Sequence, residues 1–204
     1  MIQLPKIDLD FDAQTHVYRH RGIKLPSVTQ IMRPMNLLLY SSIPSDTMAI
    51  AAGRGTRAHE QVESIVKYGV VEYDEDTKCY IDAFMSFRQM YNPTWLASEF
   101  AVYHRQMHYA GMIDLIGYVT PDDDTGVDLI DLKTTASYHE VMLSTQLGAY
   151  ANALMSHGVK VRSLYGLQLL KNGKFRFERV EDGYKTFLHA LALMNAMVPE
   201  MAAK

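Results

Sequence analysis

The sequence predicts an α/β fold, an α+β arrangement in which a mixed sheet is flanked by helices. Two apolar runs, over residues 109–118 and 127–135, are typical of buried strands, and turn-forming residues over 121–126 join them as an antiparallel pair. A helical pattern over 138–156 then returns the chain to another strand over 159–170. Antiparallel strands followed by such a crossover give a sheet of mixed direction with helices packed against it.

The N-terminal part of the sequence precedes this sheet-forming region. Its pattern predicts a β-hairpin over 7–24. Ser27 is the expected N-cap of a short helix, because its hydroxyl can accept an N–H of the first helical turn. A loop-like stretch that contains Pro34 and Pro44 then leads to a longer helix over about 46–68.

Two further helices and two strands complete the expected elements. A helix over 76–91 precedes a strand over 95–103, and a strand over 175–180 precedes a final helix over 182–198. The first of these helices carries aromatic residues along one side, and we interpret them as core: Tyr80, Phe84, Phe87 and Tyr91.

The composition is that of an ordinary globular protein. The chain has 204 residues, 48% of them apolar and 21% charged, which is enough for one domain with a substantial core. No apolar run is long enough to span a membrane, and residues 1–6 lack the apolar core of a signal peptide, so we expect a cytoplasmic protein with no membrane partner. Cys79 is the single cysteine, which excludes an intrachain disulfide and an all-cysteine metal site.

The net charge of −3 does not indicate a nucleic-acid binder. It does not exclude one either, because an enzyme that acts on a polyanion needs only a local basic lining. We interpret the basic groups of the sequence as solvated faces unless they lie near a site. These groups are Arg19, Arg21 and Lys24; Arg54 and Arg57; and Lys171, Lys174, Arg176 and Arg179.

One acid and one lysine stand out because they lie in an apolar run. Strand side chains alternate between faces, so Asp131 and Lys133 point the same way while Leu132 points the other. Burying a carboxylate and an ammonium group costs several kcal/mol unless each has a partner. The partner of Asp131 is therefore either Lys133, in an ion pair that only orders the strand, or a metal ion.

The neighbouring strand carries a lone acid of the same kind, Asp114, between Ile113 and Leu115. Adjacent strands can bring Asp114 and Asp131 to one point, and carboxylate oxygens at one point form a site for a hard divalent cation. Glu99 is the single acid of the strand before it. It is either exposed at a sheet edge or a third carboxylate directed at the same site.

His59 lies in the long predicted helix. The stretch His-Glu-x-x-Glu that it opens is half of the zinc-protease pattern, but Glu63 stands where the second histidine would be, which excludes that class. His59 is then either a structural residue or a ligand beside the acids. Gly53 and Gly55 would let this helix approach another element closely.

Two polar side chains are expected on one face of the helix over 138–156. Gln146 and Tyr150 are four residues apart, so they are neighbours on its surface. The alternative interpretation makes Gln146 a surface residue and Tyr150 an aromatic residue at the edge of the core.

Taken in chain order, these residues resemble the PD-(D/E)xK nuclease superfamily, specifically its RecB-like and phage-type exonuclease branch. The resemblance covers about residues 53–170. It implies a restriction-endonuclease-like core. The motifs that carry it are His59 on a helix, Glu99, Gly111-x-x-Asp114, Asp131-x-Lys133 and Gln146-x-x-x-Tyr150.

The resemblance also implies one nuclease domain over 1–204. Within it, a hairpin and lead-in cover 1–45, a catalytic core covers 46–180 and a C-terminal helix covers 181–204. Two positions depart from the superfamily pattern. The proline that usually precedes the first acid is Ile113 here, and the second acid is Asp131 where glutamate is frequent.

The activity that the resemblance implies is that of a Mg²⁺- or Mn²⁺-dependent deoxyribonuclease, an exonuclease that acts on linear DNA, single- or double-stranded. The alternatives are an endonuclease of the same superfamily and a catalytically inactive DNA-binding module of the same fold. A homo-oligomer or a recombination partner protein is compatible with either activity.

By the same resemblance, each site residue has an expected role. Lys133 orients the attacking water or helps to deprotonate it, and Glu99 carries a second metal or a bridging water. Gln146 and Tyr150 position Lys133, the acid or the DNA backbone. The expected metal ligands are His59, Asp114, Asp131 and the backbone carbonyl of Leu132.

Overall fold

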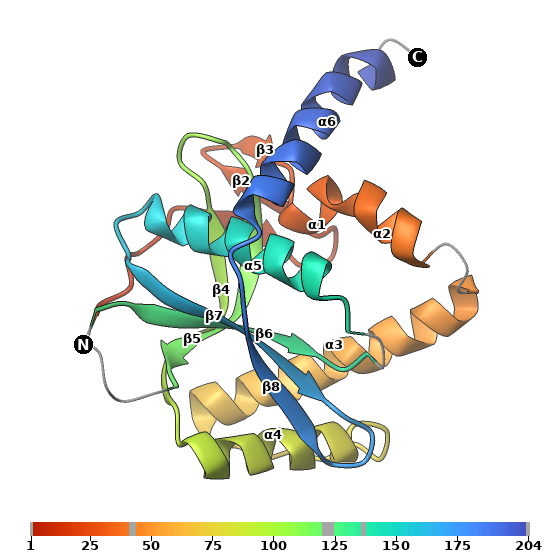
Figure 1. Ribbon diagram of the computed structural model, residues 1–204, viewed down its shortest axis with the longest axis vertical. Coiled ribbons are helices and arrows are strands. Elements are labelled where there is room, and N and C mark those ends of the chain that lie inside the picture. The colour runs from red at the N-terminus through yellow and green to blue at the C-terminus, as the bar shows by residue number, and fades with distance from the viewer. Residues whose placement is uncertain (1, 41–43, 120–124, 136–137, 203–204) are drawn as a thin grey trace.

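The computed structural model describes residues 2–40, 44–119, 125–135 and 138–202 and is an α/β fold built on a mixed sheet (Figure 1). Its five strands lie in the order β4-β5-β6-β7-β8. The β6–β7 pair is parallel and the other neighbours are antiparallel, which confirms the predicted fold class. The strands are β4 (Thr94–Tyr103), β5 (Ala110–Tyr118), β6 (Val127–Lys133), β7 (Val161–Leu169) and β8 (Phe175–Val180).

All five predicted strands are confirmed, and α5 (Glu140–Met155) makes the expected crossover between β6 and β7. β6 ends at Lys133, shortly before the predicted end at residue 135. Lys133 therefore lies where the strand leaves the sheet. The predicted turn over 121–126 lies mostly outside the described residues.

Helices cover both faces of the sheet, with α4 (Lys78–Tyr91) on one side and α5 on the other (Figure 1). Apolar strand residues pack on α4 on one face, among them Leu132 and Leu167 against Phe84 and Phe87. Others pack on α5 on the opposite face, among them Leu129 and Leu164 with Leu143 and Leu147. Because side chains alternate along a strand, Asp131 and Lys133 share the α5 side with Leu129.

The long helices agree with the sequence-based expectation. α3 (Ser45–Tyr68) ends where Gly69 adopts a φ of 70°, a left-handed cap that favours glycine. α6 (Tyr184–Ala202) continues past the predicted end at residue 198. Of the aromatic residues expected on α4, all but the half-buried Tyr91 are fully buried. None of the helices in the described part of the chain combines the length and apolar character that a membrane crossing requires.

The N-terminal region forms a separate three-stranded sheet of β1 (Asp10–Asp12), β2 (Val17–His20) and β3 (Ile23–Leu25). The predicted hairpin is confirmed, but the sequence prediction missed that its second half is itself two strands. The chain reverses at Arg21 and Gly22, whose φ angles of 50° and 78° suit a two-residue hairpin turn.

Two helices connect this sheet to α3. Ser27 caps α1 (Val28–Ile31) as predicted, in a capping box with Gln30. The loop-like stretch expected before α3 is wrong in part, because α2 (Arg33–Tyr40) is a helix. Pro34 lies in its first turn, where the missing N–H breaks no hydrogen bond and the fixed φ suits a helix.

Candidate functional site

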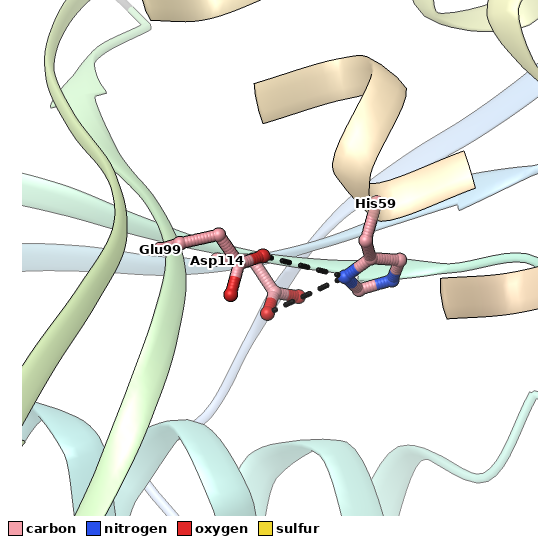
Figure 2. Close-up of side chains that lie close together, drawn as sticks. All are labelled: His59, Glu99 and Asp114. Carbon is pink, nitrogen blue, oxygen red and sulfur yellow. Dashed lines mark ion pairs between the residues drawn. The ribbon is translucent and has the colours of Figure 1, made fainter. Parts of the chain in front are cut away.

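Three side chains from three elements, α3, β4 and β5, converge at one point (Figure 2). His59 on α3 points toward the carboxylates of Glu99 on β4 and Asp114 on β5. The Nδ1 atom of His59 lies 3.7 Å from Glu99 Oε1 and 3.7 Å from Asp114 Oδ1. The side chains of His59 and Glu99 are each 27% exposed and that of Asp114 is 12% exposed, so the cluster opens to solvent.

Strand register brings the two acids together. Ser98 pairs with Leu115 and Phe100 with Ile113, so Glu99 lies across from Asp114. Like charges in such positions destabilise a sheet. Glu99 also has a φ of 47°, a left-handed conformation that costs a residue other than glycine roughly 1–3 kcal/mol. A strained backbone and two facing carboxylates oppose folding here, which is typical of a functional site.

α3 approaches the sheet closely enough to deliver His59. A Cβ atom on Gly55 would lie 3.1 Å from Thr134 Oγ1, so this glycine is where the helix comes against the end of β6. This agrees with the expectation of a close approach at Gly55. Gly53 has no such contact within the described residues, because a Cβ atom there would only reach Arg57 at 4.0 Å.

Asp131 lies on β6 and is buried, with its Oδ2 atom 2.7 Å from Lys133 Nζ. No described residue forms a hydrogen bond with its Oδ1 atom. Asp114 takes a different partner from the same strand, because its Oδ2 atom accepts the Leu132 N–H at 2.7 Å. The ion pair between Asp131 and Lys133 therefore exists, and it leaves half of the Asp131 carboxylate without a partner.

A hydrogen-bond chain runs from this ion pair to α5. Lys133 Nζ donates to Gln146 Oε1 at 3.3 Å, and Gln146 Nε2 donates to the Tyr150 hydroxyl at 3.1 Å. Gly111 makes room for the tyrosine, because a Cβ atom there would lie 2.4 Å from Tyr150 Cε1. Gln146 and Tyr150 thus share a face of the helix that is directed at Lys133, and the alternative of a surface glutamine is wrong.

The charges of the cluster shift its pKa values. Burial raises the pKa of Asp131 to about 6, although Lys133 opposes the shift. Burial and the neighbouring Glu99 raise the pKa of Asp114 against the opposing charges of His59 and Lys133. Burial alone would lower the pKa of His59, but the carboxylates of Asp114 and Glu99 outweigh it and raise this pKa to about 9. The raised pKa of His59 indicates that the two carboxylates favour an added positive charge between them.

The residues of this cluster fit a divalent metal ion. Their potential ligand atoms all lie within 4.8 Å of one another. Ligands of hard cations lie roughly 2.0–2.6 Å from the ion, so opposite ligands of one ion are about 4–5 Å apart. Carboxylate oxygens suit Mg²⁺ and Mn²⁺, and an imidazole nitrogen is compatible with Mn²⁺. The buried Oδ1 atom of Asp131 is a further oxygen, and no residue in the described part of the chain forms a hydrogen bond with it.

The structure places the predicted ligands in two groups. His59 and Asp114 lie in the cluster together with Glu99, whereas Asp131 forms an ion pair with Lys133. The Leu132 N–H contacts Asp114, and coordination by the Leu132 carbonyl stays a prediction. Glu99 and Asp114 both lie near His59 Nδ1, so Glu99 belongs to the site and does not point away from it at the sheet edge.

Sequence analysis missed one residue near the site. Tyr18 on β2 is 1% exposed, and burial followed by the charges of Glu99 and Asp114 raises its pKa. The N-terminal sheet therefore places Tyr18 close to the carboxylates of the site. No local pattern indicates this, because β2 is held near the site by contacts between segments distant in sequence. His20 stacks on Tyr103 of β4, and Pro26 O accepts the Ala110 N–H of β5 at 2.9 Å.

Comparisons with known proteins add no assignment of function. No protein-family model matches the sequence, and no curated protein matches it. Among solved structures, the chain is similar to SSO0001, with 16% identity and a TM-score of 0.44 over 84% of this chain and 75% of that one. It is also similar to an alkaline exonuclease, LHK-Exo, from Laribacter hongkongensis, with 10% identity and a TM-score of 0.39 over 72% of this chain and 84% of that one.

Proposed function

We propose that this chain is a divalent-metal-dependent nuclease that hydrolyses phosphodiester bonds of DNA, as an exonuclease on linear molecules. The observation that carries the proposal is the cluster of His59, Glu99 and Asp114 beside the buried pair of Asp131 and Lys133. Carboxylates at one point, with a lysine next to them, are suited to bind a hard cation and a phosphate together. The choice of an exonuclease rests on the resemblance of the motifs alone.

Asp114 and His59 would hold Mg²⁺ or Mn²⁺, with Asp131 and the Leu132 carbonyl as further ligands and Glu99 at a second metal or a bridging water. When bound, such an ion lowers the pKa of a ligated water and offsets charge on the phosphate. Asp114 is oriented for this role because the Leu132 N–H holds its Oδ2 atom, which leaves Oδ1 facing His59.

Lys133 would act on the attacking water and on the phosphate. Its ammonium group contacts Asp131 Oδ2 and Gln146 Oε1, which lie on different elements and help to fix its position. A positioned cation stabilises the negative charge that develops on the phosphate as the water attacks. Gln146 and Tyr150 position Lys133 and need not touch the substrate.

The test is degradation of end-labelled linear DNA and of closed circular DNA with Mg²⁺, Mn²⁺ or EDTA. We expect metal-dependent loss of linear DNA only, absent in Lys133→Ala and retained in Lys160→Ala, an exposed lysine that serves as the matched control. Nicking of the circles would change the assignment to an endonuclease. No cleavage with either metal and no thermal shift on adding Mn²⁺ would contradict catalysis and leave a binding module.

A further inference from the structure

Two rows of cross-strand partners extend from the site toward the β8 edge of the sheet, on the side that α5 covers. The partners are Asp131, Gly166 and Glu178 in the first row, and Lys133, Gln168 and Arg176 in the second. The residues between them on β7 and β8, Leu167 and Phe177, lie on the α4 side. Apart from Gly166, the face that continues the site is therefore polar.

Gly166 is the one member of the first row without a side chain, and Tyr138 occupies the space. A Cβ atom on Gly166 would lie 2.7 Å from the Tyr138 hydroxyl and 2.4 Å from Leu143 Cδ2. The tyrosine therefore packs on the sheet between Asp131 and Glu178. Its hydroxyl is buried and forms no hydrogen bond with any residue the structure describes.

Tyr138 holds an arginine in a defined position. The Arg176 guanidinium carbon lies 4.6 Å from the centre of the Tyr138 ring, and Arg176 Nε lies 2.6 Å from Glu178 Oε1. Stacking on an aromatic ring and a contact at Nε orient the planar group. Its two terminal NH₂ groups form no hydrogen bond within the described ranges, and the side chain is 49% exposed.

This arginine lies at a distance from Lys133 that suits a nucleic-acid strand. Neighbouring strands are about 4.8 Å apart, so two strand spacings put Arg176 roughly 10 Å across the sheet from Lys133. A nucleic-acid strand advances about 3.4 Å per nucleotide in a duplex. The arginine is then within about three nucleotides of a phosphate held at Lys133.

The negative charge of the site requires a cation nearby to bind a nucleic-acid strand, and Arg176 can supply it. Glu99, Asp114 and Asp131 face a substrate that is itself a polyanion, and Lys133 is engaged with Asp131. Binding a nucleic-acid strand therefore needs cations next to the acids. Of the basic group over residues 171–179, Arg176 shares the face of Lys133, whereas Arg179 pairs with Tyr165 and lies on the opposite face.

We infer that Arg176, held on Tyr138, binds a backbone phosphate of the substrate strand beside the active site. The inference deepens the proposed nuclease function and rests on it for the identity of the substrate. Glu178 contacts the guanidinium at Nε, and the two NH₂ groups can donate in parallel to phosphate oxygens. Tyr138 keeps the group in place before the strand arrives, which lowers the entropy lost on binding.

The experiment measures binding without cleavage. A fluorescein-labelled single-stranded DNA oligonucleotide is titrated with protein in EDTA, and fluorescence anisotropy is followed at several salt concentrations. We expect Arg176→Ala to bind about tenfold more weakly, as for the loss of a charged hydrogen bond. The plot of log K against log salt has a negative slope, and in Arg176→Ala it should be less steep by about 0.7, the value for one phosphate contact on a single strand.

Matched variants separate this role from general charge and from folding. Arg179→Ala removes the same charge from the same strand on the other face, and its binding should equal that of the wild type. Tyr138→Phe keeps the aromatic platform and should bind normally, whereas Tyr138→Leu should weaken binding. The double variant of Tyr138→Leu and Arg176→Ala should bind no more weakly than Arg176→Ala alone, because the two residues act as one unit.

Failure of this inference can be told from failure of the proposed function, because cleavage by the wild type with Mn²⁺ is scored separately. Cleavage by the wild type together with normal binding by Arg176→Ala, or an equal loss in Arg179→Ala, would overturn the phosphate site and leave the nuclease. Binding that depends on Arg176 without any cleavage would support the phosphate site and contradict the nuclease. A wild type that neither binds DNA nor cleaves it would overturn both.

Discussion

Two buried aspartates on β6 have opposite environments although only two residues separate them. Asp128 Oδ2 accepts the Val119 N–H at 2.9 Å, and Arg162 contacts both of its oxygens. Asp131 has Lys133 on one oxygen and no described hydrogen-bond partner on the other. Both side chains are almost completely inaccessible to solvent, so burial does not distinguish them.

The hydrogen-bond partners of the two carboxylates, and not their burial, separate a structural aspartate from a candidate ligand. When both oxygens of a buried carboxylate are paired, these contacts offset the free-energy cost of its desolvation, and they order the strands around it. A buried carboxylate with an unpaired oxygen and a raised pKa has binding capacity that the fold does not use. We therefore expect Asp128 to stabilise the fold and Asp131 to act as a metal ligand, and substitutions at the two positions test these roles.

The largest expected effect is on cleavage. Asp131→Asn removes the charge of a predicted metal ligand, and cleavage should fall by about 10²- to 10³-fold, as for other charge-stabilising groups. Its melting temperature should stay near that of the wild type, because the buried charge itself opposes folding. Single-turnover cleavage rates and thermal melts measure both quantities. Wild-type cleavage by Asp131→Asn would contradict its assignment as a ligand.

The matched substitution at the other aspartate should have the reverse effect. Asp128→Asn leaves Arg162 without its carboxylate, and breaking a buried ion pair costs about 3 kcal/mol or more. For a chain of this size, that corresponds to a melting temperature lower by roughly 6–12 °C. Cleavage per folded molecule should be unchanged at low temperature. Lost cleavage with an unchanged melt would reverse the two assignments.

Metal binding should stabilise the protein through the site and not through Asp128. Saturation at about a hundredfold excess over Kd contributes about 2.7 kcal/mol, which raises the melting temperature by roughly 5–10 °C. Differential scanning fluorimetry with Mn²⁺ should show this shift in the wild type and in Asp128→Asn, and it should be absent in Asp114→Asn. An equal shift in Asp114→Asn would place the metal elsewhere.

The same binding should strengthen as pH rises. His59 has a pKa raised to about 9, so in the metal-free protein its proton is held below that pH and must leave before its nitrogen can bind a metal. The stabilising contact between protonated His59 and the acids is present below about pH 6.5 and lost as pH rises through about 9. Calorimetric titration with Mn²⁺ should therefore give a lower Kd toward pH 9, and this trend should weaken in His59→Ala.

The smallest effect is expected at the positioning residues. Gln146→Ala removes a hydrogen bond that holds Lys133 and should slow cleavage by about tenfold without abolishing it. Val141→Ala, an exposed position on the same helix, is the control and should cleave normally. A loss as large as that of Asp131→Asn would mean that Gln146 contacts the reacting groups directly.

Local patterns in the sequence were enough to predict most helices and strands and to indicate the candidate site residues. Strand alternation placed Asp131 and Lys133 on one face, and helical spacing placed Gln146 with Tyr150, because both depend only on neighbours along the chain. The same reasoning failed at α2, because Pro34 is compatible with both a loop and a first helical turn. The roles of the site residues and the extent of the domain remain predictions.

The partners of these residues depend on the tertiary fold. Asp128 and Asp131 look alike in sequence, and the choice between them depends on Arg162, which reaches Asp128 from a strand more than thirty residues later. His59 meets Glu99 and Asp114 only because α3 comes against the end of β6 and the strand register sets the acids opposite each other. Side-chain partners are set by register and long-range packing, whereas periodicity reports only the face on which a residue lies.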